Sequence, residues 1–267
     1  MAGYKLFHGD CLEEMSKMED GSVDMVFADL PYGTTECKWD SVISFESLWE
    51  SYHRICKRNA AIVFTASQPF TSALVMSNPK WFRYEWIWVK SKATQFLTAN
   101  LQPMKKHESI LVFSRFPIAH SVKEKMTYNP QGLEYVGKKI EKHKGNSSCI
   151  SGRGNSEGKE YEKYTGYPAS VLFFPSQGNT IHPTQKPVTL MEYLVKTYTN
   201  EGDTVLDNVM GSGTTLVACA NTGRNSIGIE KFPLEGIPVD KKKNPNYFYE
   251  AQDRISKAYA DVETRLF

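Results

Sequence analysis

Short, continuous apolar runs alternate with stretches of helical spacing along the first ninety residues of the chain. The runs Val23–Ala28 and Ala60–Ala66 have the length and composition of buried strands. Between them, large apolar residues recur every three or four positions over Phe45–Lys57, which predicts a helix with one buried face. The same criteria predict four more elements in this part: strands over Tyr4–His8 and Tyr84–Lys90, and helices over Cys11–Met18 and Pro69–Met76.

The regular pattern weakens near Ser91 and returns after His182. Strands that alternate with helices favour an α/β fold, with a mostly parallel sheet and helices on both faces. We therefore predict one core formed by residues 1–90 and 181–267. Its C-terminal part is expected to contain strands over Thr204–Asp207 and Ser226–Glu230, and helices over Val188–Tyr198, Thr214–Ala220 and Tyr247–Leu266.

Residues 91–180 are expected to be an insertion in this core. One clear strand is predicted there, over Ser109–Ser114, and Gly145–Gly158 is typical of a loop. The segment is also rich in lysine, with glycine and serine between the charges.

The composition excludes several classes of protein. Hydrophobic residues make up 40% of the 267 residues, which is enough for a buried core, and no run approaches the roughly 18 apolar residues of a membrane span. The first six residues lack the pattern of a secretory signal, so a cytoplasmic protein is expected. Five scattered cysteines without a C-x-x-C pair predict neither a zinc site nor a disulfide framework. The net charge of +2 permits nucleic-acid binding without requiring it.

The first motif that can carry chemistry is D-L-P-Y, formed by Asp29, Leu30, Pro31 and Tyr32 at the end of a predicted buried strand. Ligand sites of open α/β sheets gather beyond such strand ends. A carboxylate and a backbone carbonyl can each accept one hydrogen of a base amine and so expose the nitrogen lone pair. The tyrosine offers a flat surface on which an extruded base can stack. Taken alone, the motif equally fits an ordinary turn.

The second motif is a strand, a glycine turn and a helix, running from Asp207 through Gly211 and Gly213 to Thr215. Glycines let a ligand approach the backbone, and the start of a helix offers free N–H groups to an anion. Glu230 ends the next strand, 19 residues beyond Gly211, where an acidic residue can hold ribose hydroxyls. A third glycine and a P-loop lysine are both absent, which favours a cofactor that contains adenosine without a pyrophosphate. A turn of this kind also serves plain strand–helix packing.

The third motif is H-P-T-Q-K-P, over residues 182–187, just before an amphipathic helix. Pro187 suits the first turn of that helix, and Lys186 could pair with a carboxylate. By itself the motif is more typical of a helix-entry loop with a solvated lysine.

In this order the motifs resemble the β-group of DNA amino-methyltransferases, bacterial and phage enzymes of restriction-modification or orphan type. Gly9-Asp10-Cys11-Leu12 resembles the G-D-C-L segment of that family. The resemblance covers both ends of the chain, about two thirds of it, and leaves the middle unmatched. It implies a Rossmann-like methyltransferase fold with a seven-stranded sheet and a permuted motif order, and S-adenosylmethionine as the cofactor.

The resemblance also implies a role for each matched residue. Asp29 and the carbonyl of Leu30 would hold the target amine, and Tyr32 would stack on the flipped base. Lys186 would bind the carboxylate of the cofactor and Glu230 its ribose. The other cofactor contacts implied are Asp10 and Cys11 at the adenine, and Asp207, Gly211, Ser212, Gly213 and Thr214 along the methionine part.

Two of the motifs depart from the family pattern. Leu30 stands where the catalytic motif usually has proline, but it keeps the carbonyl acceptor. The cofactor motif usually begins D-P-F, whereas here Asn208 and Val209 follow the aspartate, so an aromatic contact with the cofactor is in doubt and Met210 is the candidate to fill that space.

The middle region of such enzymes reads the DNA sequence, so DNA is the expected partner and residues 91–180 are the expected target-recognition region. Lysines there would mostly bind phosphates. A solvated charged surface explains most of them equally well when each is taken singly. The candidates for DNA contact are Lys90, just before this region, and Lys92, Lys105, Lys106, Lys138, Lys139, Lys142, Lys144 and Arg153 within it.

An aspartate at the head of the catalytic motif favours adenine N6, because cytosine N4 enzymes more often have serine there. Methylation of cytosine N4, of RNA or of a protein amide remains the alternative, as does a DNA-binding module without turnover. No metal is required, and Cys37 and the adjacent pair His107 and Glu108 are interpreted as structural. A cognate restriction nuclease and a homodimer stay open as further partners.

Overall fold

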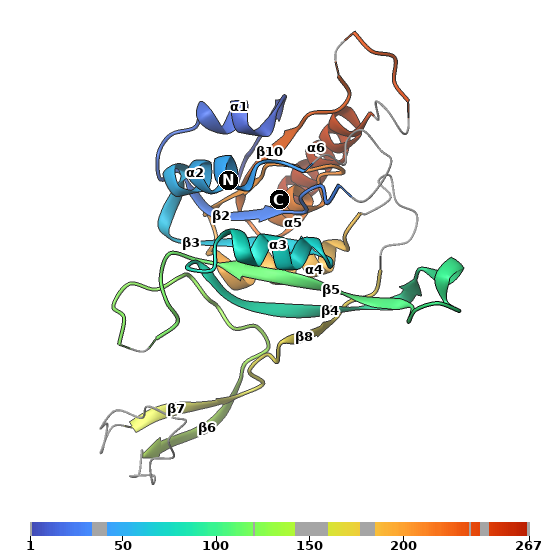
Figure 1. Ribbon diagram of the computed structural model, residues 1–267. Helices are drawn as coiled ribbons and strands as arrows, with labels where there is room; N and C mark the ends of the chain where they lie inside the picture. Colours follow the sequence, from blue (N-terminus) through green and yellow to red (C-terminus); the bar gives the residue numbers. More distant parts are fainter. Residues whose placement is uncertain are drawn as a thin grey trace. The chain divides into compact units, whose positions relative to one another are not determined.

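A computed structural model describes residues 2–33, 42–119, 121–141, 160–176, 185–234, 236–240 and 246–265 (Figure 1). The chain forms two compact units. The larger one contains Met1–Asn129 and Ser170–Phe267, and the smaller one contains Pro130–Ala169.

The larger unit is built on a mixed sheet. Within the described residues it has eight strands, in the order β1-β10-β9-β2-β3-β5-β4-β8. Seven were expected; β8 is the addition, because its three residues pair in parallel with Ile87–Val89 of β4. The strands are β1 (Tyr4–His8), β2 (Val23–Ala28), β3 (Cys56–Ala66), β4 (Phe82–Thr94), β5 (Lys105–Phe113), β8 (Val171–Phe173), β9 (Thr204–Asp207) and β10 (Asn225–Glu230).

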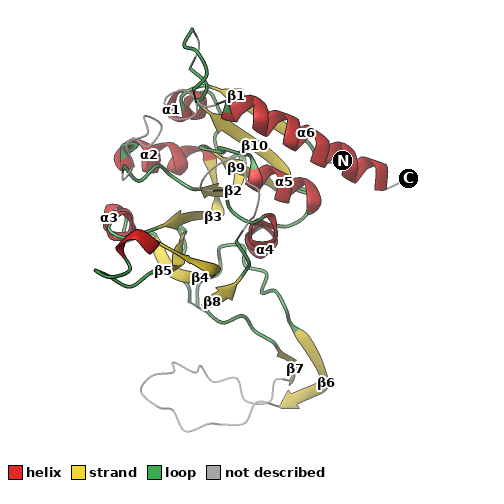
Figure 2. Ribbon diagram, turned by 90° about the vertical axis from the view of Figure 1, so that its right-hand side faces the viewer, coloured by secondary structure: helices red, strands yellow, loops and turns green. Residues whose placement is uncertain are grey.

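The α/β fold with helices on both faces of a mostly parallel sheet is confirmed (Figure 2). Alternate residues of one strand face opposite sides. Thus Val26 packs with α1, α2 and α3, whereas Phe27 packs with α4 and α5. The helices are α1 (Cys11–Ser16), α2 (Phe45–Ile55), α3 (Phe70–Ser77), α4 (Val188–Tyr198), α5 (Thr214–Asn221) and α6 (Tyr247–Arg265).

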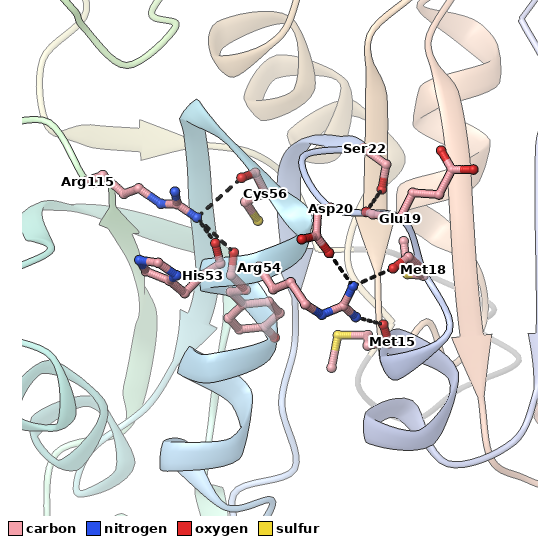
Figure 3. A network of polar contacts seen from close by, with 10 residues as sticks. Met15, Met18, Glu19, Asp20, Ser22, His53, Arg54, Cys56 and Arg115 are labelled. Atoms are coloured by element: carbon pink, nitrogen blue, oxygen red, sulfur yellow. Dashed lines mark hydrogen bonds and ion pairs between the residues drawn. The ribbon is translucent and has the colours of Figure 1, made fainter.

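Two arginines fix the ends of α1 and α2 (Figure 3). Arg54 donates to the carbonyls of Met15, at 2.6 Å, and of Met18, and so ties the last turn of α2 to the end of α1. Arg115 donates to the carbonyls of His53 and Cys56 at the other side of the same turn. The last backbone carbonyls of a helix have no hydrogen-bond donors within the helix. The two guanidinium groups donate to carbonyls at these helix ends.

The smaller unit contains an antiparallel pair, β6 (Glu134–Glu141) and β7 (Glu160–Thr165). It is narrower than the insertion expected over residues 91–180. The difference arises because β5 and β8, which fall within those limits, pair with strands of the main sheet and belong to the core. No helix in the described ranges is long and apolar enough to cross a membrane.

Candidate active site

One cavity of about 730 Å³ lies where the strands of the parallel half of the sheet end. The register aligns these ends, since His8 pairs with Glu230 and Gly228 with Asp207. The turn after β2 and the glycine turn after β9, remote in sequence, both line this cavity, as the motif interpretation required. Its lining includes Asp10, Cys11, Asp29, Leu30, Pro31, Tyr32, Glu108, Lys186, Asp207, Met210, Gly211, Ser212, Thr214, Glu230 and Phe232.

Asp29 is bonded to three side chains at the cavity. Its Oδ1 accepts hydrogen bonds from the hydroxyls of Tyr32, at 2.9 Å, and of Thr65 at the end of β3. Its Oδ2 lies 2.5 Å from Nζ of Lys186. The ring of Tyr32 packs on Phe70, with 4.9 Å between the centroids, and Leu30 is buried beside it.

The charges of this cluster shift the ionisation of its members. Burial alone would raise the pKa of Asp29, but the charge of Lys186 and the hydrogen bonds of its partners outweigh burial and hold that pKa below the usual value. Burial opposes the charge of Lys186 as well, yet Asp29 and then Glu108 keep its pKa above the usual value. Both groups are therefore ionised at neutral pH, and Asp29 is a pure acceptor.

Glu108 and Thr65 belong to the site although the sequence interpretation missed them. Glu108, expected to be structural, lines the cavity, pairs with Lys90 and places Oε2 3.6 Å from Nζ of Lys186. No motif in the sequence marks either residue as part of a site. The antiparallel register of β5 with β3 pairs Thr65 with Ile110. Thr65 donates to Asp29, and Glu108, two residues before Ile110, lines the cavity.

The glycine turn has the geometry that its composition predicted. Gly211 and Gly213 have φ angles of 48° and 70°, in the left-handed region that favours glycine. Arg254 of α6 donates to the carbonyl of Ser212 at 2.8 Å and to Oγ1 of Thr214 at 2.9 Å, which fixes the turn. Gly213 is not among the residues that line the cavity. A Cβ at this position would lie 2.6 Å from Cδ1 of Ile255, so the absence of a side chain lets the turn pack closely against α6.

Two buried carboxyl groups hold the loops around the cofactor motif. Glu230 accepts from the backbone N–H of Gly211 and of Phe232, each at 2.9 Å, and burial raises its pKa. Asp207 accepts from the hydroxyl of Thr215 at 2.6 Å. Burial raises the pKa of Asp207 to about 7, the hydrogen bond from Thr215 acting in the opposite direction.

Asp10, which also lines the cavity, is the N-cap of α1. Its Oδ1 accepts from the backbone N–H of Leu12 at 3.0 Å, and Lys231 lies 3.1 Å from Oδ2. Burial raises the pKa of Cys11 to about 11, so its thiol stays neutral. Phe232, which the sequence interpretation did not single out, lines the cavity near Glu230, and Met210 lines it from the glycine turn.

The candidate DNA contacts differ in accessibility. Lys90 is largely buried and paired with Glu108, while Lys105 is half-buried. Lys92 and Lys106 are exposed. Other predicted residues lie outside the described part of the chain. They are the side chains of Lys138 and Lys139 and the whole residues Cys37, Lys142, Lys144, Arg153, His182, Pro183 and Thr184.

Comparison with known proteins finds DNA methyltransferases. A family described as DNA methylase matches residues 23–233. The DNA adenine methyltransferase YhdJ of Escherichia coli (strain K12) is 28% identical over 240 residues, covering 84% of this chain and 77% of that protein. The type II methyltransferase M.HpaI of Haemophilus parainfluenzae is 25% identical over 236 residues, covering 85% and 69%.

Solved structures share the fold. The PvuII DNA methyltransferase, described as cytosine-N4-specific, superposes with a TM-score of 0.64 at 14% identity, covering 98% of this chain and 93% of that one. The complex of M1.HpyAVI with SAM gives a TM-score of 0.57 at 22% identity, covering 94% and 98%. The family match spans most of the chain and contains both the D-L-P-Y turn and the glycine turn. The chain therefore belongs to the N6 and N4 DNA methylase family, the β-group of amino-methyltransferases that its motifs resemble.

Proposed function

We propose that this protein is a DNA methyltransferase that uses S-adenosylmethionine to methylate the exocyclic N6 amine of adenine. The observation that carries the proposal is the single cavity on which Asp29 and Tyr32 from one motif and Gly211 and Glu230 from the other converge.

The residues of the cavity fit this cofactor. A volume of about 730 Å³ lies within the range of small-molecule sites and leaves room for a nucleoside beside a base. Glu230, fixed by two backbone N–H groups, would hold the ribose hydroxyls. Phe232 and Asp10 would flank the adenine, and the turn around Gly211 and Ser212 would hold the methionine part. When bound, the cofactor supplies an electrophilic methyl group on a sulfonium.

The catalytic motif would prepare the amine. Ionised Asp29 and the carbonyl of Leu30 accept its two hydrogens, which directs the nitrogen lone pair towards the methyl group. The base would stack on Tyr32, whose hydroxyl now donates to Asp29. Entry of the amine therefore exchanges this hydrogen bond for one from the substrate. Stacking, worth roughly 1–3 kcal/mol, offsets much of the cost of extruding the base.

Adenine is favoured over cytosine by the aspartate at the head of the motif, and YhdJ carries the name of an adenine methyltransferase. We further propose that Pro130–Ala169 takes part in target recognition. Its sequence holds six of the lysines that lie between the two motifs, and it forms a unit of its own. Deletion of this unit should preserve cofactor binding and abolish the choice of DNA sequence.

The test is expression in a host that lacks DNA methylation, digestion of the genomic DNA and quantification of methylated nucleosides by mass spectrometry. We expect N6-methyladenine from the wild type and from the control Asp261→Ala, which changes an exposed carboxylate on α6. Asp29→Ala should give none while it still binds S-adenosylmethionine in calorimetry. N4-methylcytosine alone would replace the adenine assignment, and an active Asp29→Ala variant would refute the catalytic role. Methylation-sensitive sequencing of the same DNA identifies the target site.

A further inference from the structure

The tip of the β4–β5 hairpin exposes an unusual number of large apolar side chains. Phe96, Leu97 and Leu101 are 77%, 99% and 86% exposed, and Met104 beside them is 39% exposed. Single exposed apolar residues are common on protein surfaces, but a group of four within nine residues marks a surface that contacts something else.

The tip is folded rather than extended. The 3₁₀ turn Phe96–Thr98 follows Gln95, whose φ is 68°. The carbonyl of Thr98 accepts from the backbone N–H of Leu101 at 2.9 Å, and its hydroxyl accepts from Nε2 of Gln102 at the same distance. These bonds close the loop on itself and leave the apolar side chains outside. Their exposure is therefore a built feature of the tip.

The β4–β5 hairpin extends past the ends of the neighbouring strands (Figure 1). Several of these strand ends line the cavity. Ala28, the last residue of β2, is level with Phe64, Leu111 and Glu85 across three successive strands. Strand β4 continues for nine residues beyond Glu85, to Thr94, which corresponds to about 30 Å at 3.3 Å per residue. Glu108, within the same arm, lines the cavity. The arm therefore starts at the active site and carries its apolar tip away from it.

The positive charge of the arm indicates a polyanionic partner. The outer part of the arm, residues 91–107, contains Lys92, Lys105 and Lys106 and no aspartate or glutamate, and Glu108 at its base is paired with Lys90. Lys92 and Lys106 are exposed on either side of the tip. Apolar side chains flanked by cations suit double-stranded DNA, in which stacked bases lie between two rows of phosphates.

We propose that the tip of this hairpin is a wedge that enters the base stack of duplex DNA beside the target nucleotide, with Lys92 and Lys106 on the flanking phosphates. The proposal rests on the proposed function. Phe96 and Leu97 would fill space between partly unstacked bases, which lowers the free energy needed to extrude the target base. A wedge of this kind matters for a duplex and not for a single strand, whose bases are already accessible.

The test compares Phe96→Ser/Leu97→Ser with wild type on an oligonucleotide that carries the mapped target site, as duplex and as single strand. Met76→Ser is the control, because Met76 is 72% exposed on α3 and far from the arm in sequence. We expect the double variant to lose about tenfold or more in kcat/KM on the duplex, equivalent to about 1.4 kcal/mol, and to match wild type on the single strand. The fluorescence of 2-aminopurine at the target position should rise less with the variant than with wild type.

Equal rates of variant and wild type on the duplex would overturn the wedge. So would an equal loss on both substrates, or a dimeric wild type in sedimentation that the substitutions convert to a monomer, since the tip would then bind a second copy. Failure of the proposed function is a different result: a wild-type protein that methylates neither substrate.

Discussion

Replacement of Lys186 by methionine tests the contribution of the buried ammonium at the catalytic motif. Methionine keeps the unbranched apolar stem and removes the charge. In the wild type, Nζ of Lys186 lies 2.5 Å from Asp29 Oδ2, with side-chain exposures of 9% and 24%. Removing one member of a buried pair costs about 3–5 kcal/mol, because the other charge is left without compensation. Since Asp29 keeps some contact with solvent, we expect the lower end, about 3 kcal/mol, or about 6–12 °C in Tm for a protein of this size.

The loss should depend on pH in a defined direction. The pKa of Asp29 is held below its usual value, so the wild-type pair stabilises the fold above the ordinary carboxyl pKa and loses this effect as pH falls through the lowered one. Without Lys186, burial would raise the pKa of Asp29. The penalty in the variant is then present at neutral pH and disappears as the carboxyl takes up a proton. The two proteins should therefore differ most near pH 8 and least near pH 5.

The measurement is thermal unfolding of the cofactor-free protein at both pH values. Lys57→Met is the matched control, because Lys57 pairs with Asp24 at a similar 2.7 Å but is 45% exposed. This variant should lose about 1 kcal/mol or less. A Lys186→Met variant that loses no more than the control, or that loses the same amount at both pH values, would refute the reasoning.

Further predictions concern the glycine turn, a buried carboxyl and a positioning residue. Gly213→Ala should cost about 2–4 kcal/mol in urea unfolding, from a positive φ and a contact with α6, whereas Gly202→Ala, with positive φ and open space, should cost about 1 kcal/mol. Since the pKa of Asp207 is raised to about 7, this group should lower the stability of the cofactor-free fold as pH rises from 4 to 7, by about 4 kcal/mol at most. Asp207→Asn should remove that part of the slope in calorimetry. Glu108→Gln should lower kcat about tenfold and shift its pH profile, since the neighbouring ammonium loses a partner. Glu85→Gln, an exposed change on β4, should leave both unchanged; an identical effect of the two substitutions would contradict a positioning role.

Much of the fold followed from local patterns. Continuous apolar runs marked β2 and β3, and helical spacing marked α2 and α4, because each element buries its own face against the sheet. The rule that ligands bind beyond the carboxyl ends of parallel strands was enough to bring Asp29 and Glu230 to one cavity.

Other features depend on pairing between strands, which no single segment encodes. Glu108 reaches the cavity only because β5 runs antiparallel to β3 and continues past its end. β8 has three residues, too few for a periodic signal, and is defined by its partner β4. Strands β6 and β7 are rich in charged residues and lack an apolar alternation. Lys186 was expected to meet a cofactor carboxylate, but its observed partner, Asp29, is set by the approach of two distant loops; the cofactor contact stays a prediction.

The order of strands has a consequence for how this chain can be divided. Strands β9 and β10, from the C-terminal segment, lie between β1 and β2, from the N-terminal segment. A break within 130–169 would therefore yield two pieces, each with a gap in its sheet that the other alone can fill. Asp29 would reside on one piece and Glu230 on the other. Methylation would then require that the two pieces associate. If each piece were fused to one of two interacting proteins, a transient interaction between them would be recorded as methylated DNA.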